Sequence, residues 1–311
     1  MQREKFTIKF TFPNLSSIPQ RGNVSIRLKK AREIEKKNNL KTIFEMVEVP
    51  ADFTKNQTEM KKTGLEIGEM LLSQNVIESI YEREEFPSNK YILHTEPSLS
   101  RSYTFDKKKK SFTPKLLWYD LDWLTNFKKQ LFLLIEFFSA SPKAIELHPG
   151  ISNRGKNTIK AFAKAIQIIV NDIKSKFNLA PLIMIENRTG HIIQDGVSIA
   201  SFWNYFKREF PNYTSNIGII LDIQQFYTVT KSHFLMQLNK IPFDAVCGAH
   251  IHTKHCAPNV HDVIPWKLVF NFLKKVNESR SLFILPEVHS ISHLIKTMNF
   301  LDINKNLYNS F

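Results

Sequence analysis

Apolar residues are grouped into short runs that recur along the chain. Eight of these runs have the length and the content of β-branched and aromatic residues that are typical of buried β-strands. They are KFTIKFTF, TIFEMVEV, KYILHTE, KAIELHPG, PLIMIENRTG, IGIILDIQQF, AVCGAHIH and SLFILPEVH. Longer segments lie between them, and residues 157–177 repeat apolar residues every three or four positions, which predicts an amphipathic helix.

The alternation of strands and helices predicts the fold class. Strands separated by helices pair in parallel through right-handed crossovers, and eight such units close a (β/α)8 TIM barrel. Because no linker rich in Pro, Gly or Ser interrupts the pattern, we expect one domain over residues 1–311. The segment 95–130 fits the alternation least, and we expect it to be a long loop after the third strand.

The later strand candidates carry a histidine or an acid near their C-terminal ends. These residues are His94, His148, Glu186, Asp222, His250 and Glu287. The C-terminal rim of such a barrel collects the ends of all its strands, so we expect these side chains to face one basin. His252 lies two residues beyond His250 and is expected to line the same pocket.

A shared basin predicts a metal site. A single residue of this kind commonly caps a helix or bonds a loop. Several carboxylates in one partly buried place repel one another unless cations compensate them. Imidazole mixed with carboxylate suits zinc, manganese or iron, and we expect zinc first and manganese second. Glu186 could bridge two ions, an arrangement that supports hydrolysis of phosphate esters by a metal-activated water.

The motifs ELHPG, IENRTG, ILDIQQ, GAHIH and LPEVH, in this order, resemble endonuclease IV, the family of metal-dependent apurinic/apyrimidinic endonucleases in the xylose-isomerase-like barrel superfamily. The resemblance covers about residues 90 to 290. It implies a DNA-repair phosphodiesterase that cleaves DNA at abasic or damaged sites by a metal-activated water.

The resemblance also implies which residues hold the metal ions. One ion would be held by His94, His148 and Glu186. The second would be held by the bridging Glu186 together with Asp222, His250 and Glu287. Glu186 and Glu287 are then the candidate catalytic residues.

The sequence departs from this family at the third metal ion. Where the family has a histidine three residues after the aspartate of the sixth strand, this chain has Gln225, whose amide oxygen is a poor partner for zinc. The family's Asp-x-His pair corresponds to Asn259 and His261, so His261 remains a candidate ligand, with His255 and Asp262 as substitutes. We therefore expect two or three zinc ions.

Two other functions explain the same residues, because the fold alone does not select a chemistry. A metal-dependent sugar isomerase or epimerase of the same superfamily would account for Gln225 and for Glu48 at the end of the second strand. A barrel without catalytic activity, which binds nucleic acid or a protein through a positive surface, is the third hypothesis.

Composition adds a charge argument and excludes several classes. The net charge of +14 is enough to attract DNA, and Arg154, Arg188 and Lys254 lie near the expected rim. Lysine runs such as DKKKK are also typical of solvated loops. Two cysteines give no disulfide framework, and no stretch approaches the roughly 18 apolar residues of a membrane span. We expect a soluble, cytoplasmic protein with DNA and no membrane as its partner.

Overall fold

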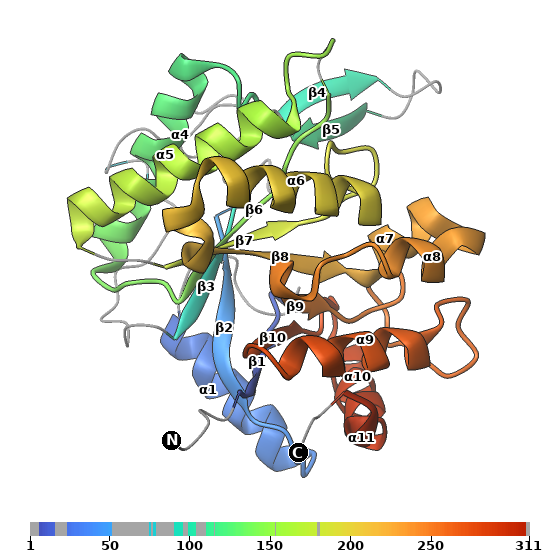
Figure 1. Cartoon of the computed structure of the whole chain (residues 1–311). Helices are drawn as coiled ribbons and strands as arrows, with labels where there is room; N and C mark the ends of the chain where they lie inside the picture. Colours follow the sequence, from blue (N-terminus) through green and yellow to red (C-terminus); the bar gives the residue numbers. More distant parts are fainter. Residues whose placement is uncertain are drawn as a thin grey trace, which may run out of the picture.

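The barrel is closed. The computed structural model describes residues 6–15, 24–51, 75, 77–78, 90–95, 99–103, 110–114, 116–152, 154–178 and 181–308. Eight parallel strands close in the order β1, β10, β9, β8, β7, β6, β3, β2 (Figure 1). They are β1 (Ile8–Phe12), β2 (Phe44–Pro50), β3 (Tyr91–His94), β6 (Ala144–Leu147), β7 (Leu182–Glu186), β8 (Ile217–Asp222), β9 (Val246–His250) and β10 (Leu282–Leu285). Each of the eight apolar runs supplies one strand, so the predicted (β/α)8 barrel is confirmed.

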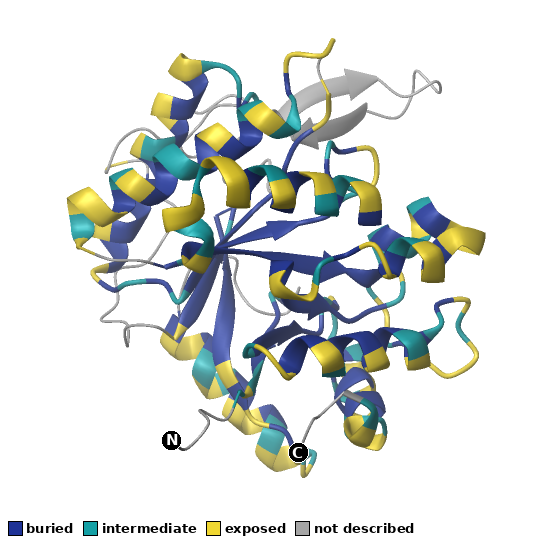
Figure 2. Ribbon diagram, in the orientation of Figure 1, coloured by how far each residue is buried: buried dark blue, intermediate teal, exposed yellow. Residues whose placement is uncertain are grey.

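Helices cover the outside of the barrel, and the longer ones bury one face each (Figure 2). The described α-helices are α1 (Val24–Lys37), α4 (Leu121–Phe138), α5 (Ile159–Phe177), α6 (Gly196–Glu209), α7 (Ile223–Thr230), α8 (Phe234–Leu238), α9 (Trp266–Asn277), α10 (Ile291–Ile303) and α11 (Lys305–Tyr308). The short 3-10 helices are η1 (Pro211–Asn216), η2 (Lys231–His233) and η3 (Phe243–Ala245). No helix in these described ranges is both long and apolar enough to cross a membrane.

The predicted helix at 157–177 is confirmed as α5. Its N-cap is Thr158, whose hydroxyl oxygen accepts a hydrogen bond from the backbone N–H of Ala161. It ends at Asn178 in the left-handed conformation, which asparagine tolerates well. The apolar face that the spacing predicted, including Phe162 and Ile166, is buried against the barrel.

The expected long loop at 95–130 is in part a hairpin and a helix. Strands β4 (Leu99–Tyr103) and β5 (Lys110–Pro114) pair antiparallel outside the barrel. Helix α4 begins at Leu121, because Asp120 caps it by accepting a hydrogen bond from Trp123 N–H. Residues 96–98 and 104–109 lie outside the described part of the chain. The lysine run concealed the strand pattern of β5 in the sequence.

The interior of the barrel has an apolar floor. A cluster of buried side chains fills it: Met46, Ile92, Ala144, Met184, Ile220, Cys247 and Phe283. Side chains two residues apart on a strand point to the same side, so the next inward positions lie closer to the C-terminal ends. These positions are polar on five strands, and they form the upper layer.

Candidate metal centre

The upper layer follows from strand periodicity. Each of five strands carries a floor residue and, two positions later, a polar residue. The pairs are Met46 and Glu48, Ile92 and His94, Ala144 and Glu146, Met184 and Glu186, Ile220 and Asp222. Strand register then brings polar residues side by side, since His94 is the partner of Glu146 and Asp222 is the partner of His250. The barrel geometry therefore assembles the site.

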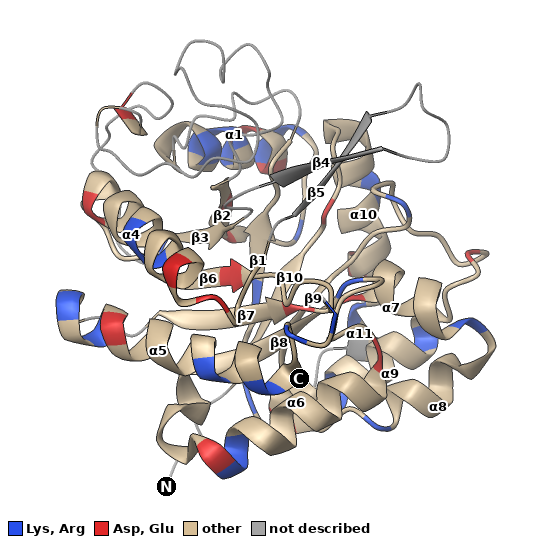
Figure 3. Cartoon of the chain, turned by 90° about the horizontal axis from the view of Figure 1, so that it is seen from above, with Lys and Arg blue, Asp and Glu red and all other residues tan. Residues whose placement is uncertain are grey.

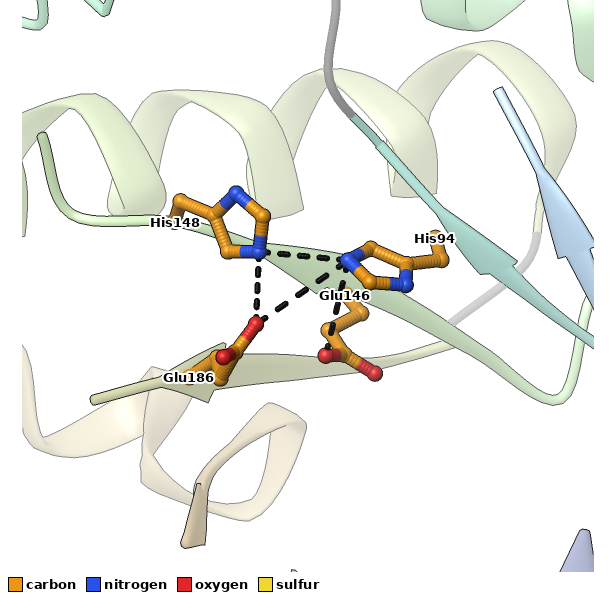
Figure 4. Close-up of side chains that lie close together, drawn as sticks. All are labelled: His94, Glu146, His148 and Glu186. Carbon is orange, nitrogen blue, oxygen red and sulfur yellow. Dashed lines mark hydrogen bonds and ion pairs between the residues drawn. The ribbon is translucent and has the colours of Figure 1, made fainter. Parts of the chain in front are cut away.

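The first cluster joins β3, β6 and β7 (Figure 4). It contains His94, Glu146, His148 and Glu186, whose nearest ligand-type atoms all lie within 4.8 Å of one another. His148 Nε2 lies 2.6 Å from Glu186 Oε2 and 3.1 Å from His94 Nε2. His94 Nε2 lies 3.8 Å from Glu146 Oε1 and 3.9 Å from Glu186 Oε2. Two imidazoles and two carboxylates thus meet in a space that fits one cation.

His94 is oriented from behind by Glu48. Its Nδ1 lies 2.7 Å from Glu48 Oε1, and Glu48 Oε2 accepts a hydrogen bond from the Asn14 N–H at 2.8 Å. The buried Arg27 donates to the Asn14 side chain at 2.9 Å. Burial raises the pKa of Glu48, but the pair with His94 lowers it more, so the net pKa lies below its ordinary value. An ionised Glu48 holds the proton on His94 Nδ1 and leaves Nε2 facing the cluster.

The electrostatics around His94 favour a positive charge. Burial lowers its pKa, and Glu146 and Glu48 raise it, to about 10. A proton on His94 Nε2 would nevertheless oppose the proton of His148 Nε2, because those atoms are 3.1 Å apart and only one can donate. A metal ion supplies positive charge at His94 Nε2 without that conflict.

His148 is held differently, by a cation. The guanidinium of Arg188 donates to His148 Nδ1 at 2.9 Å. The same guanidinium nitrogen lies 3.5 Å from His148 Nε2, so it lies over the ring, and the proton position follows from the contact that His148 makes with Glu186. From Nε2 His148 donates to Glu186 at 2.6 Å. In this arrangement His148 is a hydrogen-bond donor to Glu186.

A second cluster shares Glu186 with the first. Glu186, Asp222 and His250 form a buried group whose ligand-type atoms lie within 4.8 Å of one another. Glu287 lies beyond β10, with Oε2 3.2 Å from His250 Nδ1. His250 Nε2 lies 3.2 Å from Glu146 Oε1. Three carboxylates and one imidazole are therefore available to one ion.

Asp222 serves both the fold and the site. Its Oδ1 accepts from Gln225 N–H at 2.8 Å and so caps α7, while Oδ2 faces His252 Nε2 at 3.4 Å. Its backbone is fixed by Asn187, which accepts from the Asp222 N–H at 3.0 Å and donates to its carbonyl at 3.2 Å. The helix-capping role and the site role of this aspartate thus coexist.

His252 links two of the acids. Its Nδ1 accepts from the His255 N–H at 3.0 Å, so its ring proton sits on Nε2. That Nε2 lies 3.2 Å from Glu287 Oε2 and 3.4 Å from Asp222 Oδ2. His255 stacks on the His252 ring with a centroid distance of 4.8 Å, and His252, His255 and Glu287 form a third cluster of ligand-type residues. With its proton on Nε2, His252 is placed to donate to both acids.

The donor set fits a divalent metal. Glu48, Glu146, Glu186 and Asp222 are buried, and Glu287 is only partly exposed. Among the described residues, both oxygens of Glu146, both nitrogens of His250 and Glu287 Oε2 lie buried without a hydrogen bond. Buried polar atoms of this kind are rare unless an ion or water completes them. A bound divalent ion would both compensate the charge and occupy these atoms.

The pKa shifts of the three acids Glu186, Asp222 and Glu287 differ in sign. For Glu287, burial raises the pKa and the ion pairs with His250 and His252 lower it, so that the net pKa is well below its ordinary value. Asp222 keeps a raised pKa, because burial outweighs the contribution of His252. For Glu186, burial raises the pKa, while His148 lowers it to a net value far below the ordinary range.

The structure places the other sequence-predicted residues elsewhere. His261 is exposed and belongs to none of the three clusters found among the described residues. Gln225 Oε1 accepts from Thr189 N–H, and Asn259 Oδ1 accepts from His261 N–H. Asp262 accepts from Thr253 at 2.7 Å as part of the loop after β9. The described residues therefore do not assemble the third ion site of endonuclease IV.

Two site residues were not assigned from the sequence. Glu146 lies in the motif ELHPG, but only its neighbour His148 was considered as a ligand. The available signal was an acid at an inward position of an otherwise apolar strand, AIEL. Glu48 was noted, but its contact with His94 connects strands distant in sequence. Of the three basic residues expected at the rim, Arg188 reaches the site, whereas Arg154 and Lys254 are exposed.

Comparisons with known proteins show similarity at the level of fold. No family model matches the chain, and no curated protein matches it in sequence. A D-allulose 3-epimerase from Methylomonas sp. in complex with D-allulose superposes with a TM-score of 0.55 at 11% identity, covering 97% of this chain and 98% of that one. The IOLI protein with a bound zinc atom gives 0.54 at 12%, covering 98% and 100%. A xylose isomerase domain protein from Alicyclobacillus acidocaldarius gives 0.51 at 14%, covering 97% and 99%.

These similarities correct the functional expectation drawn from the sequence. The solved structures with this fold are mostly sugar epimerases and isomerases, so the expected DNA-cleaving phosphodiesterase is wrong. They show the fold of this chain and no similarity to endonuclease IV in particular. The residues that the resemblance implies for the third ion of endonuclease IV are the ones that this chain lacks.

Proposed function

We propose that this protein is a metal-dependent sugar isomerase or epimerase. The observation that carries the proposal is the buried group of Glu186, Asp222 and His250 with Glu287 beside it, at the C-terminal mouth of a barrel shared with sugar epimerases. We further propose that this group binds zinc or manganese. The mixed nitrogen and oxygen donors suit either metal.

The chemistry requires proton transfer at a carbon beside a carbonyl. A bound divalent ion would polarise the oxygens of a sugar and make the adjacent C–H more acidic. Glu186 and Glu287 are the carboxylates placed to remove and return that proton, since the low pKa of each keeps it ionised. His148 donates to Glu186 and His252 faces Glu287, so each carboxylate has an imidazole that fixes its orientation.

The proposal is tested by turnover of a sugar panel. The protein, loaded with zinc or manganese, is incubated with ketoses, aldoses and their phosphates, and the isomers are separated by chromatography. We expect a new isomer from at least one sugar, at a rate reduced at least 100-fold in Glu287→Gln, because its carboxylate carries the proton. Glu278→Gln, an exposed acid at the end of α9, is the matched control and should keep full activity. Absence of any isomer across the panel contradicts the proposal.

A further inference from the structure

We propose that the N-terminal end of the barrel binds a small phosphate-bearing anion through Lys9, Lys143 and Arg280. This end lies opposite the candidate metal centre, which occupies the C-terminal ends of the strands. The ligand is either the free phosphate ion or the phosphate group of a small metabolite. The proposal does not depend on which reaction the protein catalyses.

The three cations come from the beginnings of three strands. Lys9 is the second residue of β1, Lys143 directly precedes β6, and Arg280 lies two residues before β10. The barrel strands are parallel, so their N-terminal ends meet at one end of the barrel. Residues far apart in the sequence therefore bring three positive charges to the same end of the molecule.

Lys9 and Arg280 both reach the apolar floor of the barrel. Lys9 is paired in register with Phe283, and its Nζ lies 5.8 Å from the centre of the Phe283 ring. Arg280 Nη2 lies 3.4 Å from the position that a Cβ would take on Gly218, a position that also touches Cys247. Phe283 and Cys247 belong to the same buried floor cluster. Both cations thus approach one floor from the side that faces away from the metal centre.

None of these three cations forms an ion pair within the described part of the chain. Arg280 donates to the backbone carbonyl oxygen of Asp244 at 3.1 Å, whereas the Asp244 carboxylate pairs with Lys207 Nζ at 2.6 Å. Lys9, Lys143 and Arg280 are all partly buried. Burial and the charge of Lys9 lower the pKa of Lys143. Partly buried charges of one sign repel one another, and a bound anion would compensate them.

Two hydroxyl groups lie beside Lys9. Ser281 Oγ accepts a hydrogen bond from the Thr7 N–H at 3.1 Å, and the hydroxyl oxygens of Thr7 and Ser281 are 3.5 Å apart. Only one hydroxyl proton can lie between these two oxygens, so the other is directed elsewhere. The Thr7 carbonyl oxygen accepts from the Leu282 N–H at 3.0 Å and continues the ladder of β1, which places Thr7 and Lys9 on one face. Ammonium, guanidinium and hydroxyl groups are the donors that bind phosphate oxygens.

The experiment measures phosphate binding and needs no substrate. The full chain is dialysed against a chelator and then against phosphate-free buffer, so that phosphate bound to a metal does not contribute. Inorganic phosphate and glycerol 3-phosphate are titrated by calorimetry in about 0.15 M chloride, which screens weak surface attraction. The tighter of the two ligands distinguishes the free ion from the phosphate group of a metabolite.

We expect the affinity to fall about tenfold or more in Lys9→Met and in Arg280→Met, because each change removes charged hydrogen-bond donors. Lys164→Met, an exposed lysine on α5, is the matched control and should keep the affinity of the unmodified chain. Circular dichroism verifies the folding of each variant.

Three results overturn the proposal. One is the absence of binding of both ligands, and another is an equal loss of affinity in Lys164→Met, which would indicate attraction by net charge alone. The third needs no variant: crystals soaked in arsenate, a phosphate analogue, whose anomalous map has no peak within about 5 Å of Lys9 Nζ and an Arg280 nitrogen. A peak there supports the proposal even if both variants fail to fold.

Discussion

At the scale of single residues, the histidines differ in what their second ring nitrogen contacts. His94 Nδ1 faces a carboxylate, which frees Nε2 for a metal, whereas His252 accepts a hydrogen bond at Nδ1 and so donates from Nε2. The sequence predicted which strand ends carry the acids and histidines. It could not predict the proton position of His94, because its partner Glu48 comes from another strand.

The proton on His250 predicts how metal binding depends on pH. Burial lowers its pKa, and Glu146 and Glu287 raise it, to a net value well above 6.5. A metal must displace this proton, so affinity should rise about tenfold per pH unit above 6.5 until the raised pKa is reached. The pairs that the protonated ring forms with its acids stabilise the metal-free fold below pH 6.5, and this contribution is lost as the pH rises through the raised pKa. Competition for zinc with a chromophoric chelator at several pH values measures the affinity. An affinity that does not change with pH would contradict the prediction.

Glu48 predicts an effect on metal affinity from outside the ligand set. Replacing it by alanine removes the acceptor of His94 Nδ1–H, and loss of such a partner typically weakens metal binding about 10- to 100-fold. The matched control is Glu45→Ala, on the same strand and exposed. Titration of both variants with zinc measures the difference. Equal affinities would show that Glu48 does not orient His94.

At the scale of elements, the spacing of apolar residues predicted the strands of the barrel, and the conformation of glycine residues shapes the loops at its rim. Gly150, in the motif HPG, has a φ of +76° and a backbone that approaches Asn157 and Leu116 closely. Its N–H donates to His191 Nδ1 at 3.0 Å, which ties the loop after β6 to the loop after β7. The hairpin of β4 and β5 was not predicted, because a lysine run masks its apolar alternation.

Two glycines in this loop separate backbone strain from crowding. In Gly150→Ala the new Cβ would lie 2.8 Å from Asn157 Nδ2, whereas in Gly155→Ala, at the same φ, it would meet nothing within 4 Å. We expect a loss of about 1 kcal/mol for Gly155→Ala and about 2–4 kcal/mol for Gly150→Ala. Urea unfolding of both variants measures this, and equal losses would show that the loop relaxes around Gly150.

At the scale of the whole molecule, many Lys and Arg side chains lie on the outer helices, whereas the acids of the candidate site lie inside the barrel. Lys and Arg are spread over the outer helices α1, α5 and α6, while acidic residues mark β6 at the centre of the barrel (Figure 3). The net charge of +14 therefore does not define the pocket. Binding of DNA to this surface stays a prediction. The sequence predicted the barrel and the gathering of acids and histidines at its C-terminal rim. It could not predict that Gln225, Asn259 and His261 lie outside the metal-ligand clusters of the described residues.

The most direct test of the central claim, metal-dependent proton transfer on a sugar, is deuterium incorporation. The metal-loaded protein is incubated with each sugar in D2O, and the carbon beside the carbonyl is followed by NMR. We predict incorporation of deuterium into at least one sugar, abolished by a chelator, restored by zinc or manganese, and lost in Glu186→Gln. A protein that holds its metal yet leaves every sugar without deuterium at that carbon would contradict the account.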